Sequence, residues 1–219
     1  MTFSILTHDR ETGTFAAAAA TGSLCVGGWV LRGDVESGLV ASQGTAPSTF
    51  WRDDALRRMY NGETAQTVVG DLTGEDSGRG HRQMIALDRT GGTGGFTGGD
   101  SVAFAGHDCQ PGLAIAGNML SSEAVLRALK TGFEMTGGSP VERMFAALEA
   151  ADVAGGDARG LQSAALLILS PEHPPLDLRI DFHETPIAAL RQLCDHAHRQ
   201  PYHDWLSEVP VLSDRFRRP

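Results

Sequence analysis

The sequence has few cysteines, little basic charge and no long apolar run, and each of these shortages excludes a class of protein. Its three cysteines, Cys25, Cys109 and Cys194, show no Cys-x-x-Cys spacing, so they form neither a disulfide framework nor a zinc site. The formal net charge of -9 argues against a nucleic-acid-binding protein, which normally carries a basic patch. The longest apolar runs, Phe15–Ala20 and Ala164–Leu169, are too short to cross a lipid bilayer.

A secretion signal and a metal-binding pattern are also missing. The first four residues contain no basic stretch followed by an apolar run, so we expect a cytoplasmic protein that contacts no membrane. Of the eight histidines, His196 and His198 lie two positions apart on an expected helix and therefore face different sides. We expect no metal and no cofactor.

Length and composition are those of a globular protein with a full hydrophobic core. Of 219 residues, 41% are hydrophobic and 21% are charged. Glycine is unusually frequent at 27 residues, which indicates many tight turns of the kind that join strands. Because no low-complexity segment separates domains, we expect a single domain over residues 1–200, followed by an irregular tail at residues 201–219.

The first 20 residues predict a β-hairpin. Thr2–Thr7 shows strand-like alternation, a turn follows at Asp9–Gly13, and Thr14–Ala20 returns as a second strand. The five alanines that end this segment also suit a helix, because alanine is the best helix former. However, the run is short and bracketed by Gly13 and Gly22, and small side chains suit a central strand between two layers. We therefore expect a strand.

The rest of the chain alternates between groups of strands and pairs of helices. This order predicts packed antiparallel sheets with helices outside, an α+β fold, instead of a doubly wound parallel sheet. The expected strands are Trp29–Leu31, Leu39–Gln43, Gln83–Asp88, Gly95–Thr97, Val102–Gly106, Leu113–Gly117, Ser163–Leu169 and Leu176–Phe182. The expected helices are Phe50–Asn61, Glu63–Asp71, Ser122–Phe133, Ser139–Asp152 and Pro186–His198.

The sequence resembles a known bacterial family in four segments that follow one another in the same order. These segments are Thr2–Asp9, Gly117–Leu120, Gly156–Leu166 and Asp177–Arg191. The family is domain of unknown function 1028, and the resemblance runs from residue 2 to about residue 195. This family is classed with the N-terminal nucleophile (Ntn) hydrolases. The resemblance implies a four-layer αββα sandwich, in which two stacked antiparallel sheets lie between helices, but it brings no established substrate.

An Ntn hydrolase uses the side chain of its first mature residue as nucleophile and the free α-amino group of that residue as base. An α-amino group has a pKa of about 7.7–8.0, close to working pH, so it can accept a proton. The resemblance makes Thr2 the candidate nucleophile once methionine aminopeptidase has removed Met1, since the side chain of Thr2 is small. The expected reaction is hydrolysis of an amide bond in a small metabolite or peptide.

The expected hairpin places further hydroxyl groups beside Thr2. If the turn is centred near residue 11, Thr2 lies opposite roughly residue 20, so Thr21, Gly22 and Ser23 lie next to it. Their hydroxyl groups can orient the amine or donate to an oxyanion. Alternatively, these three residues only end a strand.

Two other polar groups are candidates for the site. Asn118, between an expected strand and an expected helix, can donate to an oxyanion or hold a substrate carboxylate; alternatively, it satisfies the backbone of a turn. A polar cluster before a buried strand can bind an amino-acid-like substrate, because arginine binds carboxylates with two hydrogen bonds, or it can serve only to lock a loop. The cluster consists of Asp157, Arg159, Gln162 and Ser163.

Two functions from different classes stay open at this point. In the first, Thr2 attacks an amide bond, its amine takes the proton, and Asn118 with Ser23 stabilises the oxyanion. In the second, the chain is a non-catalytic binding or assembly protein on the same scaffold. The expected partner is a small-molecule or peptide substrate and not a nucleic acid, and the resemblance implies a homo-oligomer, for which we expect a dimer.

Overall fold

The computed structural model describes residues 1–155 and 160–219, in which ten strands form two antiparallel sheets. The larger sheet contains β1 (Thr2–Asp9), β2 (Thr14–Thr21), β7 (Phe104–Gln110), β8 (Leu113–Leu120), β9 (Ser163–Leu169) and β10 (Leu176–Ile180). The smaller sheet contains β3 (Leu31–Asp34), β4 (Gly38–Gly44), β5 (Arg82–Asp88) and β6 (Thr93–Thr97). Their strand orders are β10-β9-β2-β1-β8-β7 and β3-β4-β5-β6, so β1 and β2 lie at the centre of the larger sheet.

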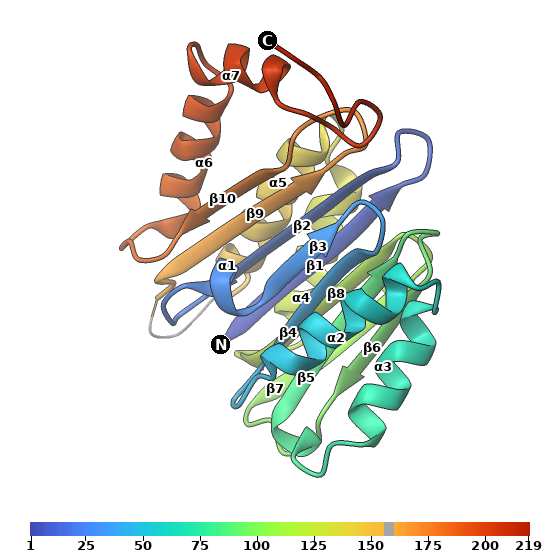
Figure 1. Ribbon diagram of the computed structural model, residues 1–219. Coiled ribbons are helices and arrows are strands. Elements are labelled where there is room, and N and C mark those ends of the chain that lie inside the picture. Colours follow the sequence, from blue (N-terminus) through green and yellow to red (C-terminus); the bar gives the residue numbers. More distant parts are fainter. Residues whose placement is uncertain (156–159) are drawn as a thin grey trace.

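Helices cover the outer face of each sheet (Figure 1). The larger sheet is covered by α4 (Ala124–Met135), α5 (Pro140–Val153) and α6 (Pro186–Ala197), and the smaller sheet by α2 (Thr49–Tyr60) and α3 (Ala65–Gly74). Shorter helices are α1 (Val26–Trp29), α7 (Tyr202–Trp205), η1 (Arg79–His81) and η2 (Leu206–Glu208). The layers are therefore helix, sheet, sheet and helix, which confirms the predicted α+β fold of two stacked antiparallel sheets flanked by helices.

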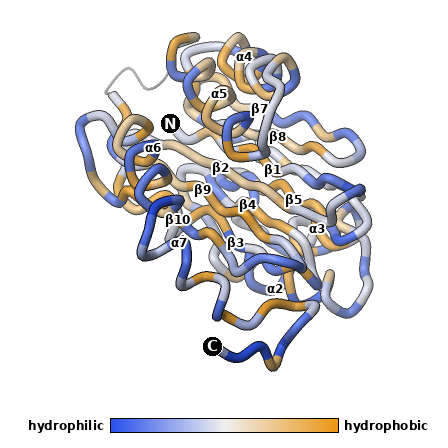
Figure 2. Tube along the Cα trace, turned by 90° about the horizontal axis from the view of Figure 1, so that it is seen from above, coloured by the Kyte–Doolittle hydropathy of each residue, from blue (hydrophilic) through white to orange (hydrophobic). Residues whose placement is uncertain are grey.

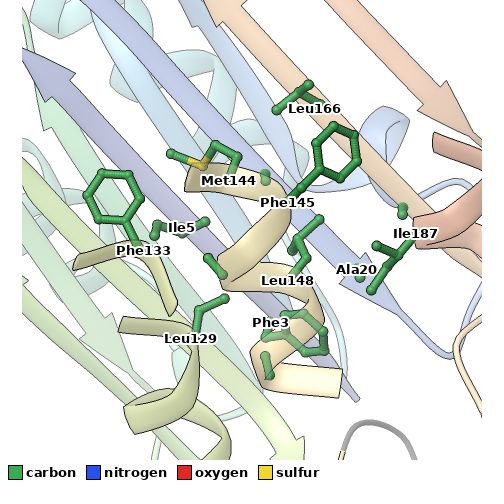
Figure 3. Close-up of a cluster of buried hydrophobic side chains, with 14 of the residues drawn as sticks. Phe3, Ile5, Ala20, Leu129, Phe133, Met144, Phe145, Leu148, Leu166 and Ile187 are labelled. Carbon is green, nitrogen blue, oxygen red and sulfur yellow. The ribbon is translucent and has the colours of Figure 1, made fainter. Parts of the chain in front are cut away.

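Three apolar clusters hold the four layers together. Alternation along β1 decides which side chain enters which cluster: Phe3 and Ile5 face α4–α6, whereas Leu6 lies between the sheets. Figure 3 shows the first of these clusters, in which Phe3 and Ile5 lie against side chains of the helices. A third cluster, which includes Trp51 and Met84, joins the smaller sheet to α2 and α3. In Figure 2 the central strands are accordingly mostly apolar.

The predicted hairpin is confirmed. The five alanines form the centre of β2 and pair with β1 in continuous register, from Phe3 opposite Ala20 to Thr7 opposite Ala16. Each of these alanines is at most 1% exposed, because β2 is covered by α5 on one side and by the smaller sheet on the other. Such close layers admit small side chains on both faces of the strand, and this burial outweighs the helical preference of alanine.

Two local predictions are wrong. Trp29–Leu31 is not a strand, because Trp29 is the last residue of α1 and only Leu31 belongs to β3. The Arg52 guanidinium donates hydrogen bonds to the carbonyl oxygens of Gly28 and Trp29, at 2.8 and 2.9 Å, and these bonds hold both residues at the end of the helix. Asn118 does not follow a strand but lies inside β8, because β1 continues to pair with β8 as far as Thr2.

Other sequence signals agree with the structure. Ser139, the first residue of an expected helix, caps α5 in a capping box, since its hydroxyl accepts a hydrogen bond from the Glu142 backbone and the Glu142 carboxylate accepts one from the Ser139 backbone. Within the described ranges, no helix is long and apolar enough to cross a membrane. Residues 201–219 carry α7, η2 and an isolated bridge between Val211 and Asp214. The boundary between domain and tail stays a prediction.

Candidate active site

Four polar residues from four neighbouring strands lie in one row across the larger sheet. Thr2 on β1 pairs with Thr21 on β2 and with Asn118 on β8, while Thr21 also pairs with Ser163 on β9. Side chains alternate between the two faces of a strand, and on each of these four strands the polar residue lies on the same face as side chains that pack between the sheets. On β1, for example, Thr2 lies on the same face as Leu6. The row therefore faces the smaller sheet, at the end of the sandwich where the chain begins (Figure 1).

A second polar row, on the smaller sheet, faces the first. Gln43 on β4 pairs with Gln83 on β5, and Gln83 pairs with Thr97 on β6. Both glutamines are buried, and Gln43 Nε2 donates to Gln83 Oε1 at 2.7 Å. The same nitrogen donates to the Thr2 carbonyl at 3.4 Å, and Asn118 Nδ2 donates to Gln83 Oε1 at 3.4 Å. The two amide side chains thus connect Thr2 and Asn118 to the opposite sheet.

The hydroxyl of Thr2 belongs to a short hydrogen-bonded chain. Thr2 Oγ1 lies 2.9 Å from Thr21 Oγ1, and Thr21 Oγ1 donates to the Met1 carbonyl at 2.5 Å. A threonine hydroxyl has a single hydrogen, so Thr21 accepts in the first bond and Thr2 is the donor. The Gly22 backbone N–H also donates to the Met1 carbonyl, at 3.3 Å. Thr21 therefore holds both the Thr2 hydroxyl and the peptide group that precedes Thr2.

A cavity of about 570 Å³ opens beside Thr2, and its volume is in the range of small-molecule sites. One wall is polar and carries Thr2, Thr21 and Asn118, while another is apolar and includes Leu24 and Trp29, which are both about half exposed. The side chains of the described residues that line it are all uncharged, although Met1 carries the N-terminal ammonium group. The lining residues are Met1, Thr2, Thr21, Ser23, Leu24, Val26, Trp29, Val30, Gln43, Gly44, Thr45, Pro47, Asn118 and Met119.

Two hydrogen bonds of the Ser163 side chain hold the segment that forms the apolar wall. The Ser163 hydroxyl, which is fully buried, donates to the Ser23 carbonyl at 2.7 Å and accepts from the Val26 backbone N–H at 3.1 Å.

Two non-glycine residues at the edges of the site, Cys25 and Met119, have left-handed backbone conformations with φ values of 60° and 56°. Side chains adopt this conformation at a cost in energy, and such residues gather at functional sites.

The structure brings most of the predicted site residues together. Thr2, Thr21, Ser23 and Asn118 line the cavity, although about 100 residues separate the first from the last. Gln162 extends the sheet instead, since its backbone N–H donates to the Thr21 carbonyl at 2.8 Å, and its carbonyl accepts from His183.

The remaining members of the predicted polar cluster are placed differently. Ser163 lies in the row but not on the cavity surface, and its hydroxyl makes the two bonds to the 23–26 segment. Asp157 and Arg159 lie outside the described residues. A substrate-binding role for these residues and for Gln162 stays a prediction.

Sequence reasoning missed Gln43 and Gln83. A signal for both exists in the strand pattern: Leu39, Ala41 and Gln43 occupy alternate positions of one strand, as do Gln83, Ile85 and Leu87 of the next. A polar side chain in phase with core positions must find buried partners, because an unpaired buried amide costs free energy. Such a residue at the end of an apolar strand is therefore a candidate for a buried polar network.

Cysteine and metal chemistry find little support around the cavity. Burial, with a smaller contribution from Asp108, raises the pKa of Cys109 to about 11, and burial also raises the pKa of Cys194. The reactive thiolate forms of both are therefore scarce at neutral pH. Within residues 1–155 and 160–219, no group of three or more histidine, cysteine, aspartate or glutamate side chains is placed to hold a metal ion. The candidate nucleophiles on the cavity surface are hydroxyl groups.

Two antiparallel sheets stacked between layers of helices define an αββα sandwich protein, in which a cavity opens at the first residue of the central strand β1. Residues 2–190 match the model of a family of unknown function, DUF1028, and the chain belongs to that family.

Two solved structures resemble this one. Protein SPO2555 from Silicibacter pomeroyi, whose crystal structure is described under the same family, is 47% identical and has a TM-score of 0.94, over 99% of this chain and 98% of that chain. Eukaryotic HslV from Trypanosoma brucei has a TM-score of 0.44 at 12% identity, over 77% of this chain and 99% of that chain. A comparison with curated protein sequences found no match.

Proposed function

We propose that this protein hydrolyses an amide bond with Thr2 as an N-terminal nucleophile. The observation that carries the proposal is the position of Thr2, whose half-buried hydroxyl lies 2.9 Å from that of Thr21 at the border of a 570 Å³ cavity. Because the described cavity lining contains no histidine or carboxylate, the base must come from elsewhere. The α-amino group that removal of Met1 would create on Thr2 is the nearest candidate.

In the proposed reaction, the Thr2 hydroxyl oxygen bonds to the carbonyl carbon of the substrate while the Thr2 amine takes the hydroxyl proton. Donors on the cavity wall, for which Asn118 and Ser23 are the candidates, stabilise the oxyanion. The C–N bond then breaks and the departing amine receives the proton, which leaves an ester on Thr2. Water hydrolyses the ester with the same amine as base, and the carboxylic acid leaves.

The second candidate is a non-catalytic binding or assembly protein. The burial of Met1 favours it: Met1 is 4% exposed, belongs to the apolar cluster under α4–α6, and has its carbonyl held by Thr21 and Gly22. If Met1 stays in the native protein, the Thr2 nitrogen is an amide and cannot act as a base. The expected homo-dimer is compatible with either function and stays a prediction.

The first experiment is the intact mass and N-terminal sequence of the protein purified from its native host. A mass that begins at Thr2 supports the hydrolase, whereas complete retention of Met1 supports the binding protein. Protein with a verified N-terminal Thr2 is then screened against small-molecule and peptide amides, with release of amine as the readout.

Three variants test the chemistry on any amide that is turned over. Thr2→Ala removes the hydroxyl, and a form that retains Met1 blocks the amine; each should abolish turnover, because the two groups act as one unit. Thr2→Ser should keep part of the activity, since serine supplies an equivalent hydroxyl. Thr131→Ala, on the exposed face of α4, is the matched control and should keep full activity. Full activity in the Met1-retaining form would contradict the proposal.

A further inference from the structure

Leu24 and Trp29 are large apolar residues that remain exposed at the edge of the candidate active site. Leu24 is 53% exposed and Trp29 is 54% exposed, and both line the cavity that Thr2 borders. Single exposed apolar residues are common on protein surfaces and need no explanation. Two that line the same concave space, at the end of the molecule where the chain begins (Figure 1), indicate instead a surface that contacts a ligand.

The backbone of residues 23–30, which carries both side chains, is hydrogen-bonded to two distant parts of the chain. The Cys25 N–H donates to the carbonyl of Asp181, the residue that follows β10, at 3.1 Å. At the other end of the segment, the Val30 carbonyl accepts from the Ser42 N–H of β4, also at 3.1 Å. The segment is therefore tied next to β10 of the larger sheet and to β4 of the smaller sheet.

Two buried side chains hold the same segment. Ser163 makes the two hydrogen bonds described above. Arg52, which is 5% exposed, binds the carbonyl oxygens of Gly28 and Trp29. All these bonds reach backbone atoms of the segment, so none of them uses the side chain of Leu24 or Trp29. A surface held in this way loses little conformational freedom when a ligand binds, and this favours affinity.

Both walls of the cavity border one space between the two sheets. Val26 and Val30 continue the apolar wall and pack in the apolar cluster that lies between the sheets. Thr2 and Asn118 belong to the polar wall, on the face of the larger sheet that is turned toward the same cluster. A ligand that fills this space therefore presents a hydrogen-bonding group to one wall and an apolar group to the other.

We propose that Leu24 and Trp29 form the specificity surface of this site, and that its substrates are small amides that carry an aromatic ring. This inference rests on the proposed function, because it names the amides that Thr2 would attack. The half-exposed indole of Trp29 offers a flat face to a second ring, and aromatic pairs gain affinity beyond that of burial alone. A ring placed on this wall leaves the amide group of the substrate toward the polar wall.

Calorimetric titration with four neutral amides tests the specificity surface. N-benzylacetamide and N-methyl-2-phenylacetamide are isomers that carry the ring on the amine side and on the acyl side of the amide, respectively. N-methylacetamide lacks the ring, and N-(cyclohexylmethyl)acetamide has a saturated ring instead. We expect one aromatic isomer to bind at least about tenfold more tightly than N-methylacetamide, and at least about twofold more tightly than the cyclohexyl compound.

The titration uses the protein as purified from its host, because the specificity surface does not include Met1. Trp29→Ala should weaken binding of the preferred isomer about tenfold, whereas Trp29→Phe should keep most of the affinity, since phenylalanine retains an aromatic face. Trp205→Ala is the matched control and should leave binding unchanged, because Trp205 is 53% exposed in α7 and lies outside the cavity lining.

Circular dichroism verifies that each variant folds. Leu24→Ala removes the other part of the surface and should weaken binding at least about threefold, so the test does not depend on Trp29→Ala alone. Equal affinity of Trp29→Ala and Trp205→Ala for the aromatic isomers would overturn the proposal. Equal binding of N-methylacetamide and the aromatic isomers, or tighter binding of the cyclohexyl compound, would also overturn it.

Release of amine from the same four amides by the form that begins at Thr2 separates this inference from the proposed function. Selective binding of an aromatic isomer without turnover of any amide would support the specificity surface and contradict the hydrolase. Turnover with no preference for the ring would support the hydrolase and contradict the specificity surface. Turnover of an aromatic isomer with a KM that Trp29→Ala raises supports both.

Discussion

Replacement of Gln83 by methionine should destabilise the protein far more than the same change at an exposed glutamine. Gln83 is fully buried, and its Nε2 contacts Thr97 Oγ1 and the carbonyl oxygens of Gly106 and Gly117 at 2.8–2.9 Å. Its Oε1 accepts from the side chains of Gln43 and Asn118. Methionine has a similar volume but makes none of these bonds, so the substitution leaves several buried partners unsatisfied.

The expected cost follows from the number of partners that water cannot reach. Each buried donor or acceptor that loses its partner costs about 1–3 kcal/mol. Gln43 Nε2, Asn118 Nδ2 and the Gly117 carbonyl lie in buried residues, whereas Gly106 and Thr97 are partly exposed and water can replace the lost bonds. The free energy of unfolding should therefore fall by about 3 kcal/mol.

Urea unfolding at pH 7, followed by circular dichroism, measures this loss, which corresponds to a fall in the midpoint of about 1 M or more. Gln66→Met, on the exposed face of α3, is the matched control and should change the free energy by no more than about 0.5 kcal/mol. In the double variant Gln43→Met/Gln83→Met the cost should be smaller than the sum of the single costs, because the two amides bond each other. A Gln83→Met midpoint equal to that of Gln66→Met would refute the reasoning.

Three further predictions concern residues around the site and the hairpins. Ser163→Ala should lower the free energy of unfolding by about 2 kcal/mol, because the Ser23 carbonyl and the Val26 N–H lose a buried partner; urea unfolding checks this, and a change under 0.5 kcal/mol would contradict it. Asp88→Asn should destabilise the protein at pH 7 but much less at pH 2. Burial pushes the pKa of Asp88 up, but hydrogen bonds from Thr90, Ala65 and Gly92 outweigh burial and leave the pKa below its ordinary value. The carboxylate therefore stabilises the fold above its unfolded pKa of about 3.9, and this contribution is lost as pH falls through the lowered folded value; a gap between the unfolding free energies of the two proteins that stays constant from pH 7 to pH 2 would argue against this account. Finally, a thiol reagent at pH 8 should modify Cys109 at least about tenfold more slowly than free cysteine, because the pKa of Cys109 is about 11; mass mapping of modified peptides over time measures the rate, and modification as fast as that of free cysteine would be inconsistent with its burial.

Local patterns in the sequence determined the elements and much of the site. Alternation and the Gly13 turn predicted β1 and β2, and counting back from that turn placed Thr21 next to Thr2. This succeeded because an antiparallel hairpin has one register once its turn is known, and both strands lie close together in the sequence. The capping box at Ser139 is equally local, since all its hydrogen bonds join residues three positions apart.

Only the tertiary structure decided the arrangement that brings Asn118 and the two glutamines to Thr2. The pairing of β1 with β8 and the stacking of the smaller sheet join residues that are far apart in the sequence, such as Asn118 and Gln83 at a separation of 35 positions, and no local pattern encodes their register. The helix at Trp29 was missed for the same reason, because the stabilising guanidinium comes from Arg52 in a later helix. The burial of Met1 likewise follows from the apolar cluster that α4–α6 complete, since a terminal residue acquires a buried environment only when distant elements close over it.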